Sequence, residues 1–177
     1  MPASPPLTVA LVAPANVLHT VRWANALSAR GHAVHLFGIH GRDSQLASAV
    51  HSHRLFFRSP HGYFLATGAL RRALRRLAPD VVNAHYASGY GTLARRAGVG
   101  PLALSVWGSD VFEFPHRSRW HRWLLVRNLL AADRVLSTSH AMAAAVQELT
   151  PLATPPAVTP FGVDTARFRP ARIPRAD

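Results

Sequence analysis

Short apolar runs and helical patterns alternate along most of this 177-residue chain. Strand-length apolar runs that alternate with helix-length segments are typical of βαβ units, in which each helix carries the chain back across a sheet. The alternation predicts strands at 7–13, 33–37, 53–57, 81–84, 102–106, 134–137 and 157–159. It predicts helices at 20–30, 63–78, 88–97, 118–131 and 140–149.

This order of elements predicts an α/β fold: a doubly wound, mainly parallel sheet with helices on both faces. In such sheets, ligands bind outside the carboxyl ends of the strands. The rule directs attention to the loops that begin near Ala13, Phe37, His85, Trp107, Ser137 and Pro160.

Composition excludes several other classes of protein. Hydrophobic residues make up 49% of the chain, which indicates a globular domain rather than a disordered one. Cysteine is absent, which excludes disulfides, thiolate nucleophiles and cysteine metal sites. The apolar run at 7–15 is short and follows no basic residue, unlike a signal peptide. No stretch approaches the ~20 apolar residues of a membrane-spanning helix.

The formal net charge is +12, and lysine is absent, so arginine supplies all of the basic side chains. Arginine binds nucleic-acid phosphates, and it also suits anionic lipids or anionic substrates. The abundance of Ala, Arg and Pro is equally compatible with a biased genome. Because the chain lacks an interleaved aromatic and basic strand platform or a recognition helix, we expect no nucleic-acid partner.

The loop after the first predicted strand contains neither GxGxxG nor the P-loop pattern. Asn16 lies in this loop, and His19 and Thr20 lie where the next helix is predicted to begin. Thr20 is a typical N-cap, which would leave His19 on the surface. The alternative is an anion that the backbone N–H groups of this helix N-terminus bind.

His85 and Tyr86 directly follow the fourth predicted strand. A histidine at the carboxyl end of a strand can hydrogen-bond a substrate hydroxyl or move a proton. The alternative is a structural histidine, partly buried with its hydrogen bonds satisfied. Gly89 and Gly91 allow a ligand to approach the backbone, or they relieve the packing of the following helix.

The fifth predicted strand ends in Trp107, Gly108, Ser109 and Asp110. Gly108 permits a tight turn, and either Ser109 or Asp110 can cap a short helix. The flat apolar face of Trp107 suits a sugar ring, or simply packing.

Two kinds of catalysis lack support in the sequence. Paired carboxylates are poorly supported, because the chain has only two glutamates, Glu113 and Glu148. The 11 histidines are scattered and no HExxH sequence occurs, so we expect no metal site.

The segment 118–130 is unusual because its apolar residues spread around most of a helical circumference. One interpretation is a buried helix whose arginines reach the surface. The other is contact with lipid, because Trp120 and Trp123 beside arginines are typical of membrane interfaces.

Five segments resemble, in order, the N-terminal domain of the family-four retaining glycosyltransferases, which have the GT-B fold. They are 19–34, 80–85, 107–110, 132–139 and 160–164. The resemblance implies a Rossmann-like domain over residues 1–160, one half of a GT-B architecture. Residues 161–177, with Phe161, Gly162 and Asp164, would form the hinge toward a C-terminal nucleotide-sugar-binding domain that is absent from the sequence.

The resemblance also implies a reaction, the transfer of a sugar from a nucleotide-sugar donor to an acceptor with retention at the anomeric carbon. The acceptor would be a sugar, a cell-envelope glycan or a lipid-linked molecule, and we expect no metal or other cofactor. Without the second domain, in cis or in trans, the chain is expected to be a weak catalyst. The alternative is a non-catalytic α/β module that binds or regulates.

On this resemblance, Asn16, His19, His85, Tyr86 and 107–110 would face an acceptor cleft. Trp107 stands where many relatives carry a histidine that contacts the donor sugar, so His85 or His19 would make that contact unless it is indirect. Asp110 would orient its loop or an acceptor hydroxyl rather than act as a nucleophile. A lipid-linked acceptor would place the protein in the cytoplasm, in peripheral contact with the anionic inner face of the membrane.

Overall fold

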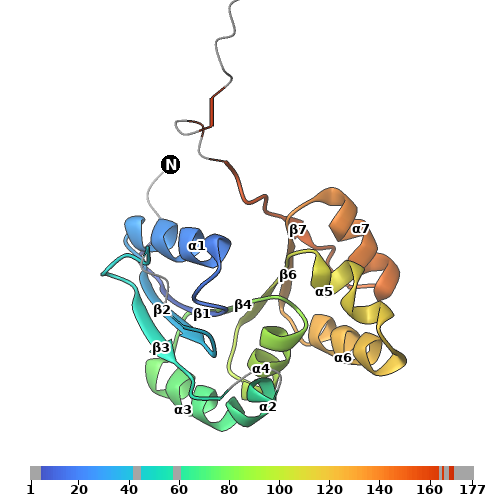
Figure 1. Cartoon of the computed structure of the whole chain (residues 1–177), viewed down its shortest axis with the longest axis horizontal. Helices are drawn as coiled ribbons and strands as arrows, with labels where there is room; N and C mark the ends of the chain where they lie inside the picture. The colour runs from blue at the N-terminus through green and yellow to red at the C-terminus, as the bar shows by residue number, and fades with distance from the viewer. Residues whose placement is uncertain (1–4, 42–44, 58–60, 164, 166–167, 170–177) are drawn as a thin grey trace, which may run out of the picture.

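The computed structural model describes residues 5–41, 45–57, 61–163, 165 and 168–169, within which the chain forms a seven-stranded sheet (Figure 1). Its strands are β1 (Thr8–Val12), β2 (Ala33–Gly38), β3 (His51–Arg54), β4 (Val81–His85), β5 (Leu102–Val106), β6 (Arg134–Ser137) and β7 (Ala157–Val158). Every neighbouring pair is parallel, in the order β3-β2-β1-β4-β5-β6-β7. The predicted doubly wound parallel sheet is confirmed.

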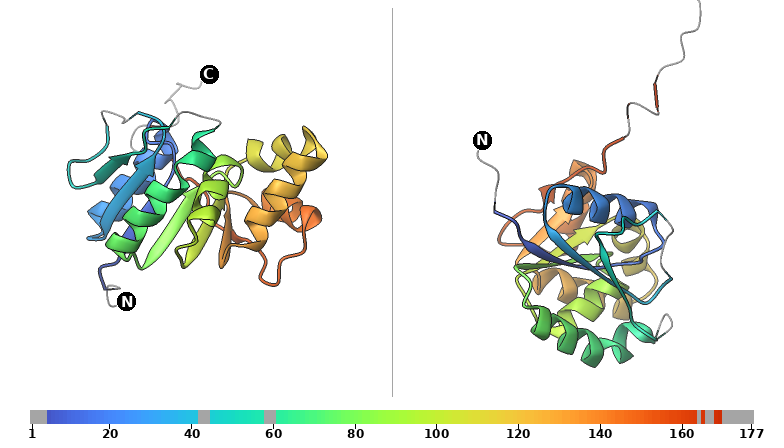
Figure 2. Two further views of the ribbon diagram at one scale, coloured as in Figure 1. Left: turned by 90° about the horizontal axis from the view of Figure 1, so that it is seen from below. Right: turned by 90° about the vertical axis from the view of Figure 1, so that its left-hand side faces the viewer.

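Helices cover both faces of this sheet (Figure 1 and Figure 2). One face carries α1 (Leu18–Ala29), and the other carries α2 (Gly62–Leu65), α3 (Thr67–Leu77), α4 (Gly89–Ala97) and α6 (Arg119–Leu130). β5 is joined to α6 by α5 (Ser109–Phe112) and the 3-10 helix η1 (Phe114–His116), while α7 (His140–Leu149) packs against β6 and β7. In the described part of the chain, no helix is long and apolar enough to cross a membrane.

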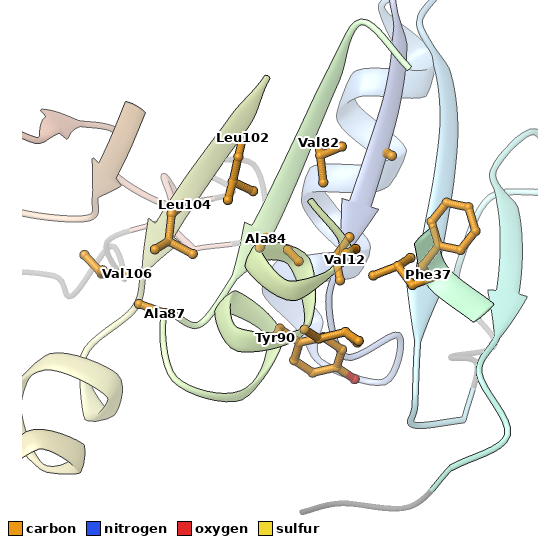
Figure 3. Close-up of a cluster of buried hydrophobic side chains, with 14 of the residues drawn as sticks. Val12, Phe37, Val82, Ala84, Ala87, Tyr90, Leu102, Leu104 and Val106 are labelled. Carbon is orange, nitrogen blue, oxygen red and sulfur yellow. The ribbon is translucent and has the colours of Figure 1, made fainter. Parts of the chain in front are cut away.

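Two clusters of buried hydrophobic side chains hold the layers together. Val9 and Leu11 of β1 pack in the cluster beneath α1, whereas Val12 points to the other face. Figure 3 shows Val12 in this second cluster, with Leu104 of β5 and Tyr90 of α4. Because helices cover both faces of the central strands, these strands are almost continuously apolar, which is why the sequence predicts them well.

The third predicted strand, at 53–57, is wrong in its position. β3 spans His51–Arg54 instead, and all four of its side chains are exposed. At this edge of the sheet, pairing with β2 determines the strand: His51 lies opposite His35, and the N–H of Leu55 donates to the carbonyl of Gly38 at 2.8 Å. Apolar character alone therefore misplaced the strand.

Two predictions about helices are also wrong. The helix predicted at 63–78 is two helices, α2 and α3, which meet at Ala66. Thr20 is not an N-cap, because α1 begins at Leu18, where the Val17 carbonyl accepts the first helical hydrogen bond from the N–H of Val21 at 3.1 Å. Thr20 lies inside the first turn and is fully buried.

Two aspartates secure the amino ends of the strands. Oδ2 of Asp80 accepts a hydrogen bond from the N–H of Thr8 at 2.7 Å, and Oδ2 of Asp133 accepts one from the N–H of Leu102 at 2.7 Å. Each aspartate directly precedes one strand and fixes the first residue of its neighbour. These two carboxylates therefore act at the edge of the sheet opposite to the strands' carboxyl ends.

Candidate functional site

The carboxyl ends of the strands bring together aromatic residues that are far apart in the sequence. His19 stacks on Phe161 with ring centroids 3.9 Å apart. Trp107 contacts both rings edge-on, with centroids 5.9 Å from His19 and 5.1 Å from Phe161. The ring centroid of Tyr86 lies 4.8 Å from that of Trp107. We call these four residues the aromatic cluster; they follow β1, β4, β5 and β7, at the edge where doubly wound sheets bind ligands.

His85, the last residue of β4, is completely buried under this cluster. Its ring lies 4.5 Å from that of Trp107 and 6.0 Å from that of Trp23 in α1. Neither ring nitrogen has a hydrogen-bond partner among the described residues, and burial lowers the pKa of the imidazole to about 3. His85 is therefore neutral near pH 7 and offers one free donor and one free acceptor. A structural histidine with satisfied hydrogen bonds does not fit these contacts.

Tyr86 has a φ of 67°, in the left-handed region that residues other than glycine rarely occupy. Its N–H donates to the Ser105 carbonyl at 3.0 Å, and its carbonyl accepts from the N–H of Gly91 at 2.9 Å. Burial, and then the nearby Asp110 carboxylate, raise the pKa of its phenol. Residues with strained backbones gather at functional sites, and the ring of this one contacts Trp107.

The carboxylate of Asp110 is almost completely buried and binds backbone amides. Oδ1 accepts from the N–H groups of Trp107 and Gly108 at 3.0 and 2.9 Å, and Oδ2 accepts from the N–H of Ala87 at 2.7 Å. Burial raises the pKa of this carboxyl, and the amide hydrogen bonds oppose the rise. Asp110 thus joins the loop after β4 to the loop after β5. Since α5 has no side-chain cap in the described structure, the capping role expected of Ser109 or Asp110 is wrong.

Asn128 of α6 supports the same region, a role that the sequence pattern does not reveal directly. Its amide nitrogen donates to the carbonyls of Ala87 and Ser88 at 2.7 and 3.1 Å and to Oγ1 of Thr92 at 2.8 Å. Its oxygen accepts from Nε of Arg95 at 2.7 Å. Asn128 is fully buried and so fixes the loop after β4 from the helical side. The sequence offers one indication of this role, a single asparagine among the leucines at the end of α6.

Side-chain packing accounts for the two glycines of α4. A Cβ on Gly89 would lie 2.5 Å from the ring of Tyr63, and a Cβ on Gly91 would lie 3.0 Å from Cδ1 of Leu104. Of the two interpretations of these glycines, relief of helix packing is therefore the one that the contacts support. Gly108 has a φ of 130°, which confirms the tight turn predicted after β5.

The remaining predicted site and hinge residues do not belong to the aromatic cluster. Asn16 and Ser109 are exposed, and so is Gly162 of the expected hinge, which has a φ of 68°. Asp164 lies outside the described residues. Over the described ranges, no group of three or more His, Cys, Asp or Glu side chains is placed to hold a metal ion.

The cluster has the chemistry of a site that binds an uncharged, ring-shaped polar ligand. Burial, and then the charge of Arg22, lower the pKa of His19, so this ring favours its neutral form as His85 does. The rings of Trp107 and Tyr86 provide apolar surface. Asp110 is occupied by backbone amides, which makes it a positioning residue.

The parallel sheet with helices on both faces belongs to the class of Rossmann-like α/β domains, and solved structures that share the fold include GT-B glycosyltransferases. Within this class, the chain belongs to the glycosyl transferase 4-like family, whose sequence profile matches residues 8–139. No curated protein matches the sequence significantly.

Solved structures with this fold come from diverse organisms. The glycosyltransferase of Rickettsia africae ESF-5 has a TM-score of 0.63 at 14% identity, over 94% of this chain and 47% of that one. Apo UGT2 of Phytolacca americana has a TM-score of 0.58 at 15% identity, and the match covers 88% of this chain and 52% of that one. MurG of Acinetobacter baumannii has a TM-score of 0.57 at 18% identity, and the match covers 93% of this chain and 48% of that one. The chain spans about half the length of each. At these identities the likeness establishes the fold alone.

Proposed function

We propose that this chain is the N-terminal, acceptor-side half of a retaining glycosyltransferase that uses a nucleotide-sugar donor. Membership of the glycosyl transferase 4-like family supports the transfer of a sugar. The solved structures are about twice as long, which is compatible with a second domain that binds the donor. The observation that carries the proposal is the aromatic cluster above the unpartnered His85. Residues 1–160 would form the domain, and 161–177 the hinge.

In this proposal, the cluster positions the acceptor and the second domain stabilises the leaving group. Trp107 and Tyr86 would stack on a sugar ring. The neutral imidazole of His85, or that of His19 nearer the surface, would hydrogen-bond a hydroxyl of the donor sugar, unless this contact is indirect. It would replace the histidine that many relatives carry at the position of Trp107. Negative charge that develops on the donor diphosphate would be stabilised by groups of the second domain. This scheme requires no metal and no further cofactor.

Sugar transfer by the chain alone, and by a protein in which a second domain follows it, provides the test. The longer protein should release nucleotide from one of a panel of UDP-sugars and GDP-sugars, and His85→Ala should lower its kcat/KM by about tenfold or more. The 177-residue chain should show at most a trace of this activity. Equal turnover by the chain alone would contradict the half-enzyme. A folded longer protein without turnover would favour a non-catalytic binding or regulatory module.

We also propose that the acceptor is lipid-linked and that the domain docks on an anionic membrane from the cytoplasmic side. α2, α3, α4 and α6 lie side by side as one layer (Figure 2, left). Their sequences contain no Asp or Glu, but four arginines in α3, two in α4 and three in α6. Trp120 and Trp123 of α6 are 50% and 52% exposed. The layer therefore combines cations with aromatic side chains of the kind found at membrane interfaces.

Sedimentation with lipid vesicles tests this docking. The chain should bind vesicles that contain phosphatidylglycerol more tightly than neutral phosphatidylcholine vesicles, and added salt should weaken the binding. Equal binding to the two kinds of vesicle would contradict the proposal. Salt-dependent binding to random RNA, without vesicle binding, would indicate a nucleic-acid partner instead.

A further inference from the structure

A pocket of about 320 Å³ lies beside the aromatic cluster, between the beginning of α4 and the segment that runs from α5 into α6. Its lining contains the Phe, Tyr and Trp side chains Tyr63, Phe64, Phe114 and Trp120, and also the imidazole of His121. The pocket reaches solvent at two of these side chains, because Trp120 is 50% exposed and Phe64 is 38% exposed. A pocket of this volume with an apolar lining can hold part of a small ligand.

The pocket adjoins the loops that carry the cluster. Asp110 lines it, and the same carboxylate binds the N–H groups of Trp107 and Ala87. Ser88 and Ser109, which come from these two loops, line it as well. A ligand in the pocket would therefore lie next to the loops that carry the residues that we propose for sugar transfer.

One cation faces the pocket. Arg117 lines it, and the partner of Arg117 is Glu113, with 3.9 Å between Nη2 and Oε2. Both side chains are mostly exposed, so water and ions weaken this long ion pair. An anionic group of a ligand can therefore compete with Glu113 for the guanidinium, which is well suited to phosphate.

We propose that this pocket binds an amphiphile that carries a phosphate, with the phosphate at Arg117 and the apolar chain along Trp120 and Phe64. The arginine-rich helical layer around the pocket favours an anionic ligand. The exposed tryptophan favours a chain that continues into a lipid surface. The identification of this amphiphile as the acceptor rests on the proposed sugar transfer, whereas its binding does not.

Calorimetric titration of the 177-residue chain tests the binding with three soluble probes. Dihexanoyl phosphatidic acid, below its micelle concentration, should bind saturably. Octyl glucoside, which lacks the phosphate, and inorganic phosphate, which lacks the chain, should each bind at least about tenfold more weakly. Equal binding of octyl glucoside would overturn the role of the phosphate. Equal binding of inorganic phosphate would reduce the site to a free anion site and overturn the amphiphile.

Matched variants locate the binding. Trp120→Ala and Arg117→Gln should each weaken the binding of dihexanoyl phosphatidic acid by about tenfold. Trp123→Ala is the control, because Trp123 lies on the same helix with 52% exposure and does not line the pocket. Glu113→Gln should tighten binding severalfold, because it removes the competing carboxylate at an exposed position where folding is not at risk.

Two outcomes would overturn the location. One is equal weakening by Trp120→Ala and Trp123→Ala, and the other is a Glu113→Gln variant that binds no more tightly than the parent. Sugar transfer by the longer protein is measured independently. If transfer fails while the phosphatidic acid binds as expected, the proposed sugar transfer is contradicted and the proposed lipid binding in the pocket is supported. If the lipid does not bind while transfer to a water-soluble acceptor persists, the pocket is wrong and the reaction stands.

Discussion

His85 combines complete burial with two ring nitrogens that have no partner among the described residues. Each unsatisfied buried polar group costs about 1–3 kcal/mol, so such a residue at the carboxyl end of a central strand suggests a role that a ligand completes. The position of His85 at the carboxyl end of its strand is predictable from the sequence. Its burial is not, because Trp23 and Trp107 cover it from distant parts of the chain.

The pKa of His85 predicts how stability depends on pH. Burial lowers this pKa from 6.5 to about 3 in the folded protein, so between these values the unfolded chain takes up a proton that the folded protein excludes. The contribution is complete above pH 6.5 and is lost as pH falls toward 3. Between pH 7 and pH 5, the free energy of unfolding should fall by about 2 kcal/mol more in the parent than in His85→Leu. Urea titrations at the two pH values check this, and equal losses would contradict it.

The hydrogen bonds of Asp110 predict that its replacement lowers the stability of the fold, whatever its effect on catalysis. Asp110→Ala leaves one buried and two partly buried amide N–H groups without their acceptor, so the free energy of unfolding should fall by about 2–4 kcal/mol. Glu113→Gln, an exposed acid three residues later, should change it by less than about 0.5 kcal/mol. Urea denaturation of both variants measures the difference. Similar values for the two would show that Asp110 does not clamp the loops.

At the scale of the elements, the sequence predicts those that an apolar run and clear flanking signals define, and it misplaces the exposed edge strand β3. β5, β6 and α7 have the predicted bounds, because an apolar run between clear turn or capping signals defines each of them. β3 is exposed, and its pairing with β2 is invisible in a hydropathy pattern. The rule for strand ends predicts His19, Tyr86 and Trp107, whereas Phe161 is expected only as a hinge residue and is found stacked on His19. The two polar clamps, Asp110 and Asn128, depend on contacts between distant elements.

The role of α6 can be tested through Asn128. Asn128→Ala removes every hydrogen bond that ties α6 to the loop after β4 through this amide, and the free energy of unfolding should fall by about 1–3 kcal/mol. Amide hydrogen exchange should become faster at Ala87 and Thr92, whose N–H groups lie in this region, and should stay slow at Leu11 in the centre of the sheet. Asn16→Ala, at an exposed position, is the control. Unchanged exchange at Ala87 would contradict the clamp.

At the scale of the whole molecule, three aspartates of the described chain bind backbone amides away from the exposed side of the helical layer's arginines. Asp80 and Asp133 act at the amino ends of the strands, and Asp110 is buried between two loops. The layer of α2, α3, α4 and α6 therefore carries arginine without acids of its own. Within this layer, Arg71 has a structural role, because its guanidinium donates to the carbonyls of Arg96 and Ala97 at the end of α4.

A substitution at Arg72 tests whether vesicle binding depends on the helical layer or only on the total charge of the protein. Arg72 is exposed on α3, and Arg72→Glu places a carboxylate one turn before Arg76, which should stabilise the helix by about 0.3–0.5 kcal/mol. The same change should weaken binding to phosphatidylglycerol vesicles by about tenfold or more, because each basic residue near an anionic surface contributes about 1 kcal/mol. Arg30→Glu makes the same change in net charge at the end of α1, on the other face of the sheet (Figure 1). It should weaken vesicle binding much less, as sedimentation of both variants would measure. If the two variants lose equal affinity, membrane binding follows the net charge of +12, and the helical layer is not the docking face.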